Sequence, residues 1–255
     1  MNLSALDYVL WVANFLGEAV LFSILICRRR WREFPIFTTL IGFEAAVPAM
    51  QYLIFLHGYH VWYARIYWTY ALLDFLLQLG VIWEIARIVL RPTGTWLRDA
   101  KKQFILWGAA GILLAAALPF LVTPPAASLL HRLEVRGNLF TALVVCELIA
   151  VVTRTSKSLG LGWRNHVMAL GNGWTAWAVV AILVDGLHSY FGAERYFREL
   201  EHVLMFVYLA ALGYWSVQFW LEEPARQPIS PQLRAYILDL HQKIKNDLDT
   251  VSAQR

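Results

Sequence analysis

The stretch ALLDFLLQLGVIWEIARIVL, residues 71–90, is long and apolar enough to cross a lipid bilayer, yet it carries Asp74, Gln78 and Glu84. A membrane-spanning helix needs about 20 mostly apolar residues, because its backbone groups must be hydrogen-bonded within the helix. The stretch lacks the strict alternation of apolar and polar residues that indicates a strand. It therefore predicts a transmembrane helix that also carries polar side chains.

The rest of the chain has the composition of a polytopic membrane protein. Of the 255 residues, 59% are hydrophobic and 16% are charged, whereas soluble domains carry about 25% charged residues. We expect an all-α fold, a bundle of seven transmembrane helices in residues 1–223, followed by a cytoplasmic linker and amphipathic helix in 224–255. The predicted spans are approximately 7–27, 35–56, 62–90, 103–123, 134–153, 166–189 and 200–221.

Basic residues gather in alternate loops between these spans. Segments 28–34, 87–102 and 154–166 hold twelve Lys and Arg residues, and the opposite side holds five. Cytoplasmic loops carry the excess of Lys and Arg, so the amino terminus is expected outside and the carboxyl terminus in the cytoplasm. The loops account for the net charge of +4, and we expect a lipid bilayer as partner and no nucleic acid.

Carboxylates near the centres of the first three predicted spans are the main candidates for a site. They are Glu18, Glu44 and Asp74, and no Lys or Arg lies at a similar depth in the sequence. A charge at the bilayer centre costs at least about 2.5–3.5 kcal/mol, so such residues normally face the bundle interior. We expect these acids, with Gln78, to bind an ion, a proton or a ligand; neutral hydrogen-bonded acids beside a kink at Pro48 are the alternative.

Glu84 has a simpler expected role near the cytoplasmic end of its span. Arg87 follows three residues later, and residues at this spacing are neighbours on a helix surface. We predict a structural ion pair between the two side chains, with the Arg87 head reaching toward the interface. A coupling or gating role for Glu84 is the alternative.

Polar residues in the outer halves of the third, fifth, sixth and seventh spans suggest a polar cup open to the outside. Such a cup would suit a small ligand, because pockets between bundle helices are common binding sites; a hydrogen-bonded cap over an apolar bundle is the alternative. The histidines lack a metal-site spacing, so we expect no metal and no cofactor. The cup candidates are Arg65, Tyr67, Tyr70, Arg136, Asn138, Asp185, His188 and His202.

The carboxyl-terminal segment 231–251 repeats apolar residues at helical spacing after Ser230 and Pro231, a favourable pair for starting a helix. The pattern predicts a cytoplasmic amphipathic helix of two to three heptads, short for a stable coiled coil. It could mediate a homodimer or dock a cytoplasmic partner, or rest on the inner face of its own bundle.

Several segments resemble those of a group of uncharacterised bacterial seven-helix membrane proteins common in soil acidobacteria. The resemblance is carried by RRRWREFPIF (28–37), IYWTYALLDFLLQLGVIWEIARIVLRP (66–92) and GLGWRNHVMALGNG (160–173). It implies a multi-pass protein of the bacterial inner membrane, and it implies nothing about mechanism.

Three functions fit these patterns. The first is a small-ligand sensor that signals through its cytoplasmic helix. The second is a proton- or cation-coupled transporter or channel that uses the three central carboxylates, and the third is a non-catalytic assembly subunit of a membrane complex. An enzyme is disfavoured, because no nucleophile or metal constellation can be assembled and no catalytic residue is assigned.

Overall fold

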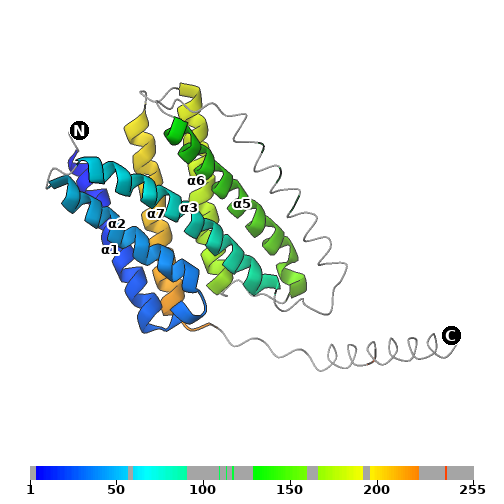
Figure 1. Ribbon diagram of the computed structural model, residues 1–255. Helices are drawn as coiled ribbons and strands as arrows, with labels where there is room; N and C mark the ends of the chain where they lie inside the picture. Colours follow the sequence, from blue (N-terminus) through cyan, green and yellow to red (C-terminus); the bar gives the residue numbers. More distant parts are fainter. Residues whose placement is uncertain are drawn as a thin grey trace, which may run out of the picture. The chain divides into compact units, whose positions relative to one another are not determined.

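The structure, a computed structural model, describes residues 4–56, 60–90, 109, 113, 117, 129–159, 166–191, 196–223 and 239. Clustering of contacts divides the chain into two units, Met1–Glu222 and Glu223–Arg255. The described residues of the first unit form α1 (Ala5–Cys27), the 3-10 helix η1 (Arg30–Arg32), α2 (Pro35–Leu56), α3 (His60–Leu90), α5 (Leu129–Leu159), α6 (His166–Phe191) and α7 (Phe197–Trp220) (Figure 1). The predicted all-α class is confirmed over this part of the chain.

Six of the seven predicted spans coincide with these helices. Of the predicted span 103–123, only residues 109, 113 and 117 are described, each of them helical, and the rest lies outside the described residues. The predicted amphipathic helix 231–251 also lies outside them, except for Asp239, which is helical. The count of seven helices and the orientation in the membrane stay predictions.

Within the part of the chain that the structure describes, four helices are long and apolar enough to cross a membrane: α1, Pro35–Ile54 of α2, His166–His188 of α6, and α7. Helices α3 and α5 form as predicted but fall outside this set. Val9, Leu16 and Val20 of α1 remain 63, 55 and 53% exposed. Exposed apolar surface of this kind suits contact with lipid, and the described helices are those of a helical membrane protein.

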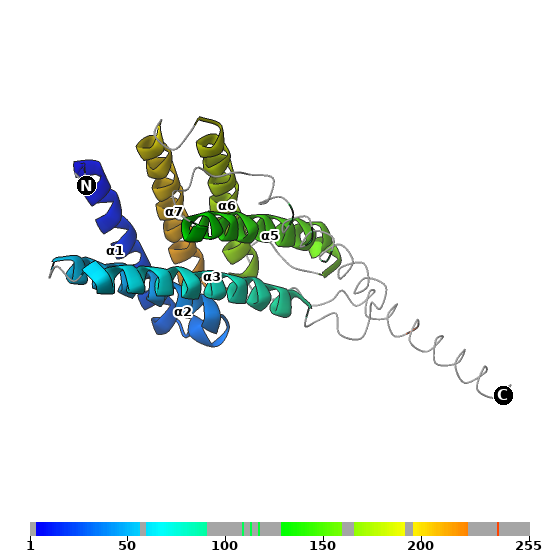
Figure 2. The same cartoon turned by 45° about the horizontal axis from the view of Figure 1, so that its top comes forward.

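The six α-helices pack in a ring. Helix α1 contacts α2 and α7, α2 contacts α3, α3 contacts α5, α5 contacts α6, and α6 contacts α7. Figures 1 and 2 show α3 beside α2 and α5 beside α6. A ring of this kind turns one face of every helix toward a shared interior, which is where polar side chains of a membrane protein can avoid lipid.

The two ends of α1 are shaped by local sequence. At its start, the Ser4 hydroxyl accepts from the backbone N–H of Asp7, and the Asp7 carboxylate accepts from that of Ser4, a reciprocal cap of the first turn. At its end, Arg29 adopts a left-handed conformation with φ 57°, which turns the chain into η1. Helix α2 then begins at Pro35, as predicted from the fixed φ of proline.

A packed apolar core lies next to this turn. Phe37 is buried between Trp215 and Phe219, with ring centroids 5.3 and 5.8 Å away. Leu21 and Leu25 of α1 and Ile85 of α3 are no more than 1% exposed in the same cluster. The α1–α2 end of the ring is therefore filled by side chains, and any internal space must lie further along the helices.

Glu84 lies at this end, and its carboxylate is bonded to the backbone of α2. Its two carboxylate oxygens accept from the backbone N–H groups of Ile36 and Phe37, at 3.0 and 3.1 Å. The guanidinium of Arg87 lies over the ring of Trp83, 5.3 Å from its centroid. The first-turn N–H groups of α2 offer buried donors that a carboxylate prefers, Arg87 acts on Glu84 only as a further electrostatic attraction, and the structural ion pair stays a prediction.

Candidate functional site

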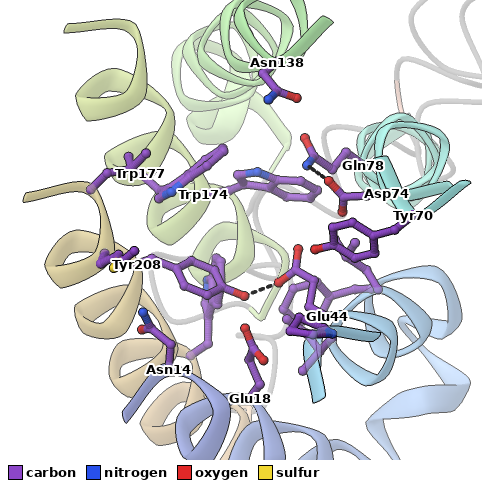
Figure 3. A pocket seen from close by; sticks show the side chains of 17 residues that line it. Asn14, Glu18, Glu44, Tyr70, Asp74, Gln78, Asn138, Trp174, Trp177 and Tyr208 are labelled. Carbon is purple, nitrogen blue, oxygen red and sulfur yellow. Dashed lines mark hydrogen bonds between the residues drawn. The ribbon is translucent and has the colours of Figure 1, made fainter. Parts of the chain in front are cut away.

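A cavity of about 300 Å³ lies inside the ring and receives side chains from all six α-helices (Figure 3). The seventeen lining residues that the structure describes include three carboxyl groups and no Lys or Arg. The sequence predicted that the central acids would turn inward, and Glu18, Glu44 and Asp74 all line this one cavity. The labelled lining residues are Asn14, Glu18, Glu44, Tyr70, Asp74, Gln78, Asn138, Trp174, Trp177 and Tyr208.

Two of the carboxyl groups meet at Tyr208. The Tyr208 hydroxyl of α7 donates a hydrogen bond to Oε2 of Glu44 on α2 and also interacts with the carboxyl group of Glu18 on α1. Figure 3 shows the Glu18 carboxyl group pointing toward this pair. Glu18 is 8% exposed and Glu44 and Tyr208 are partly buried, so residues of three helices share one polar cluster.

The third carboxyl group extends the cluster to α3. Gln78 donates to Oδ2 of Asp74 at 2.8 Å, which the spacing of four residues predicts on a helix face. Glu44 interacts electrostatically with both Asp74 and Glu18. Glu44 is therefore the acid that links the other two electrostatically.

The amide oxygen of Asn14 is a hydrogen-bond acceptor for which no donor is described. It lies one turn before Glu18 on α1 and lines the cavity. Its Oδ1 atom is buried and has no hydrogen-bond partner among the described residues. A buried polar atom of this kind normally finds a partner in protein, water or ligand, so the arrangement leaves room for a donor from the cavity.

The remaining wall is largely aromatic and apolar. Trp174 and Trp177 of α6 line the cavity, and Trp174 is 4% exposed. Trp215 donates its indole N–H to the carbonyl of Ala169 at 3.2 Å, which holds the ring in place. Phe37 and Tyr70 complete the aromatic surface. Aromatic faces attract cations as well as apolar groups.

Two of the eight predicted cup residues, Tyr70 and Asn138, line this cavity. His202 bonds to Oδ1 of Asp7 at 2.5 Å, and His188 stacks on Phe197 with centroids 5.0 Å apart. Tyr67 packs edge-on against Trp68. The structure does not place Arg65, Tyr67, Arg136, Asp185, His188 or His202 among the lining residues, and a separate outer cup stays a prediction.

Sequence reasoning missed Tyr208 and the three tryptophans of the wall. Tyr208 lies in an apolar helix rich in aromatic residues, where nothing in the spacing separates it from an interfacial anchor. Trp174 follows Gly173, and an added Cβ at Gly173 would lie 2.4 Å from Nε1 of Trp215. A glycine inside an apolar span is the sequence signal that could have indicated this close approach of α6 and α7.

Comparison with models of protein families, with curated proteins and with solved structures found no match. The resemblance to the acidobacterial seven-helix group therefore stays a prediction. Among the described residues, no three His, Cys, Asp or Glu side chains are grouped so that they could hold a metal ion.

Proposed function

We propose that the protein binds a small cationic ligand in the cavity and acts as a sensor in the membrane. The observation that supports this most directly is that Glu18, Glu44 and Asp74 come from three helices and line one space. The lining residues that are described supply no basic side chain to neutralise them. A cation that entered the cavity would supply the missing positive charge where desolvation of a carboxylate is most costly.

The sensing role is supported by how the site connects the helices. Tyr208 and Glu44 join α7 to α2, and Arg30 of η1 donates to the carbonyl of Leu221 at the end of α7. A ligand that draws the acids together would change the packing of α1, α2 and α7. We propose that the predicted cytoplasmic helix 231–251, which follows α7 in the chain, passes this change to a partner or to a second copy.

The membrane arrangement belongs to the same proposal. It comprises seven spans with the amino terminus outside and the carboxyl terminus in the cytoplasm of a bacterial cell, in the inner membrane. Helices α1, α2, α6 and α7 are long and apolar enough to cross a membrane, and the Arg-rich turn at 28–32 supports a cytoplasmic location for the α1–α2 end.

Cation binding can be tested on the full chain in lipid nanodiscs by thermal unfolding. The panel would contain inorganic cations, organic cations, anions and neutral solutes. A ligand present at a hundred times its Kd stabilises a protein by about 2.7 kcal/mol, so at least one cation should raise Tm clearly. Combined E18Q, E44Q and D74N substitution should abolish the increase, whereas E199Q, at an exposed position outside the lining, should preserve it. Stabilisation by anions or neutral solutes alone would refute the proposal.

A second candidate is proton- or cation-coupled transport. It is favoured by the continuous series Glu18, Tyr208, Glu44, Asp74 and Gln78, in which neighbouring groups interact. Chains of acids and hydroxyls inside a bundle carry protons in pumps and transporters. Proteoliposomes separate the two functions: a transporter gives a pH-gradient- or potential-driven flux that the triple substitution removes, and a sensor gives none.

A further inference from the structure

We propose that the ligand is a small organic ammonium ion, with a primary amine bound at Asn14 and the acids and a compact apolar body against the aromatic wall. This inference rests on the proposed cation binding and gives it a chemical class. It is carried by the size of the cavity, by the hydrogen-bonding groups that remain open and by the composition of the wall.

The size of the cavity favours an organic molecule over a bare ion. A volume of about 300 Å³ corresponds to about ten water molecules at their share of liquid volume, roughly 30 Å³ each. Ligand pockets in proteins start at about this size. A dehydrated metal ion would leave most of the space empty, whereas a molecule on the order of ten non-hydrogen atoms would fill it.

The open hydrogen-bonding groups call for a donor. Three of the donors in the lining are already used: Tyr208 bonds to Glu44, Gln78 bonds to Asp74, and Trp215 bonds to the carbonyl of Ala169. Oδ1 of Asn14 is buried without a described partner, and the adjacent carboxyl oxygens can accept further bonds. A primary ammonium brings three N–H donors and a positive charge, which suits these acceptors and the charge of the acids.

The aromatic residues of the lining determine which body, next to the ammonium group, the ligand can have. Trp177 and Tyr70 line the cavity and are partly exposed, while Trp174 and Phe37 behind them are packed at 4 and 1% exposure. The rings of Trp177 and Tyr70 suit an apolar or aromatic body next to the charged head. Because the described lining contains no Lys or Arg, a carboxylate on the ligand would find no counter-charge, and amino-acid zwitterions should be rejected.

A matched set of probes tests the proposal on the full chain in lipid nanodiscs, with binding measured by titration calorimetry. 2-Phenylethylammonium carries the primary amine, and 2-phenylethanol replaces that amine with a neutral hydroxyl. Phenylalanine adds a carboxylate, and trimethyl(2-phenylethyl)ammonium keeps the charge without an N–H. The primary ammonium should bind at least about tenfold more tightly than each of the others, since a hydrogen bond to a charged group contributes this much.

Substitutions locate the interaction. N14L should weaken binding of the primary ammonium about tenfold or more and leave the trimethyl compound unchanged, whereas N14D, which keeps an acceptor, should retain binding. W177L, at a partly exposed position of the lining, should weaken both cations, and W83L, at a position 57% exposed outside the cavity, should weaken neither.

The outcomes separate the two levels of the proposal. Binding of Na⁺, K⁺ or Mg²⁺ without any ammonium probe would overturn the ammonium assignment and leave cation binding intact. Equal binding of the ammonium and the alcohol would overturn it as well. An absence of binding by every inorganic and organic cation would overturn both the assignment and the proposed function.

Discussion

Tyr208 on α7 donates a hydrogen bond to Glu44 on α2, across 164 positions of sequence. The bond joins two helices that do not follow one another, at the centre of the cavity. It also satisfies an acid that would otherwise lie in a low-dielectric interior without a donor. The stability of the ring and the state of the candidate site therefore depend on the same contact.

Replacing Tyr208 by Phe should destabilise the protein, because the substitution removes the donor and leaves a buried carboxyl acceptor unsatisfied. The expected loss is about 1–3 kcal/mol, measured by denaturation in detergent. In a double-mutant cycle with E44Q, the two effects should be coupled by about 0.5–3 kcal/mol. Y214F, on the same helix but outside the lining, serves as control. Additive effects would show that the Tyr208–Glu44 bond contributes nothing.

Replacing Glu84 by Ala should destabilise the protein by about 2–5 kcal/mol, because two charge-assisted bonds to the start of α2 are lost. E84Q should lower the free energy of unfolding by less, because the amide oxygen of the glutamine can still accept one of the two hydrogen bonds. R87A should cost little, because Arg87 contacts the exposed ring of Trp83. The measurement is thermal unfolding of the three variants. A loss in R87A equal to that in E84A would favour the ion pair over the backbone bonds as the main contribution of Glu84.

Replacing Gly173 by Ala should also destabilise, because the added Cβ would lie 2.4 Å from the indole of Trp215. That ring is fixed by its bond to Ala169 and by packing on Phe37, so relief by rotation is costly, and overpacking of this kind costs about 1–3 kcal/mol. G213A is the matched control, since nothing lies within 4 Å of an added Cβ there; it should be neutral or slightly stabilising. Comparison of Tm values decides between the two outcomes.

Asp7 and His202 should behave as a pair. The 2.5 Å contact joins the first turn of α1 to the second turn of α7. D7N and H202A should each lower Tm, and the double variant should lower it by little more than either alone. S4A provides a comparison that removes only the capping hydroxyl of α1. Independent effects of D7N and H202A would mean that Asp7 acts through the cap and not through His202.

The orientation can be checked with reporters fused after residue 223. We expect a fluorescent protein to be active there and alkaline phosphatase to be inactive, since the carboxyl end is predicted to be cytoplasmic. Changing Arg28, Arg29, Arg30 and Arg32 together to Asn should reduce the proportion of correctly oriented chains. Phosphatase activity in the unmodified chain would reverse the predicted topology.

The fold class and most helix positions could be predicted because hydrophobic length and proline placement are local properties. The same is true of the pair Asp74 and Gln78, which lie four residues apart on one helix. Contacts between helices were harder to predict from the sequence. The sequence placed Glu84 beside its nearest base, but it did not predict the bonds of Glu84 to the backbone of Ile36 and Phe37, 48 and 47 positions away.

Tyr208 shows the same limit at the site. That three acids must face inward follows from the cost of exposing them to lipid, and the cavity contains all three. Which donor meets them depends on how α7 is rotated and how deep it lies. The rotation and depth of α7 depend on its packing around Leu212 and Trp215. This packing between helices cannot be predicted from a single sequence.

The distance in sequence between Glu44 and Tyr208 also matters while the chain is being made. At about 5–20 residues per second, the ribosome needs roughly 8–33 s to add the 164 residues that separate the acid from its donor. During that interval α2 has already been synthesised. Its Glu44 carboxyl group is costly to expose to lipid, and the Tyr208 hydroxyl that will bond to it does not yet exist. The early helices must therefore wait beside the insertion machinery, or beside one another, until the last helix arrives to complete the interior.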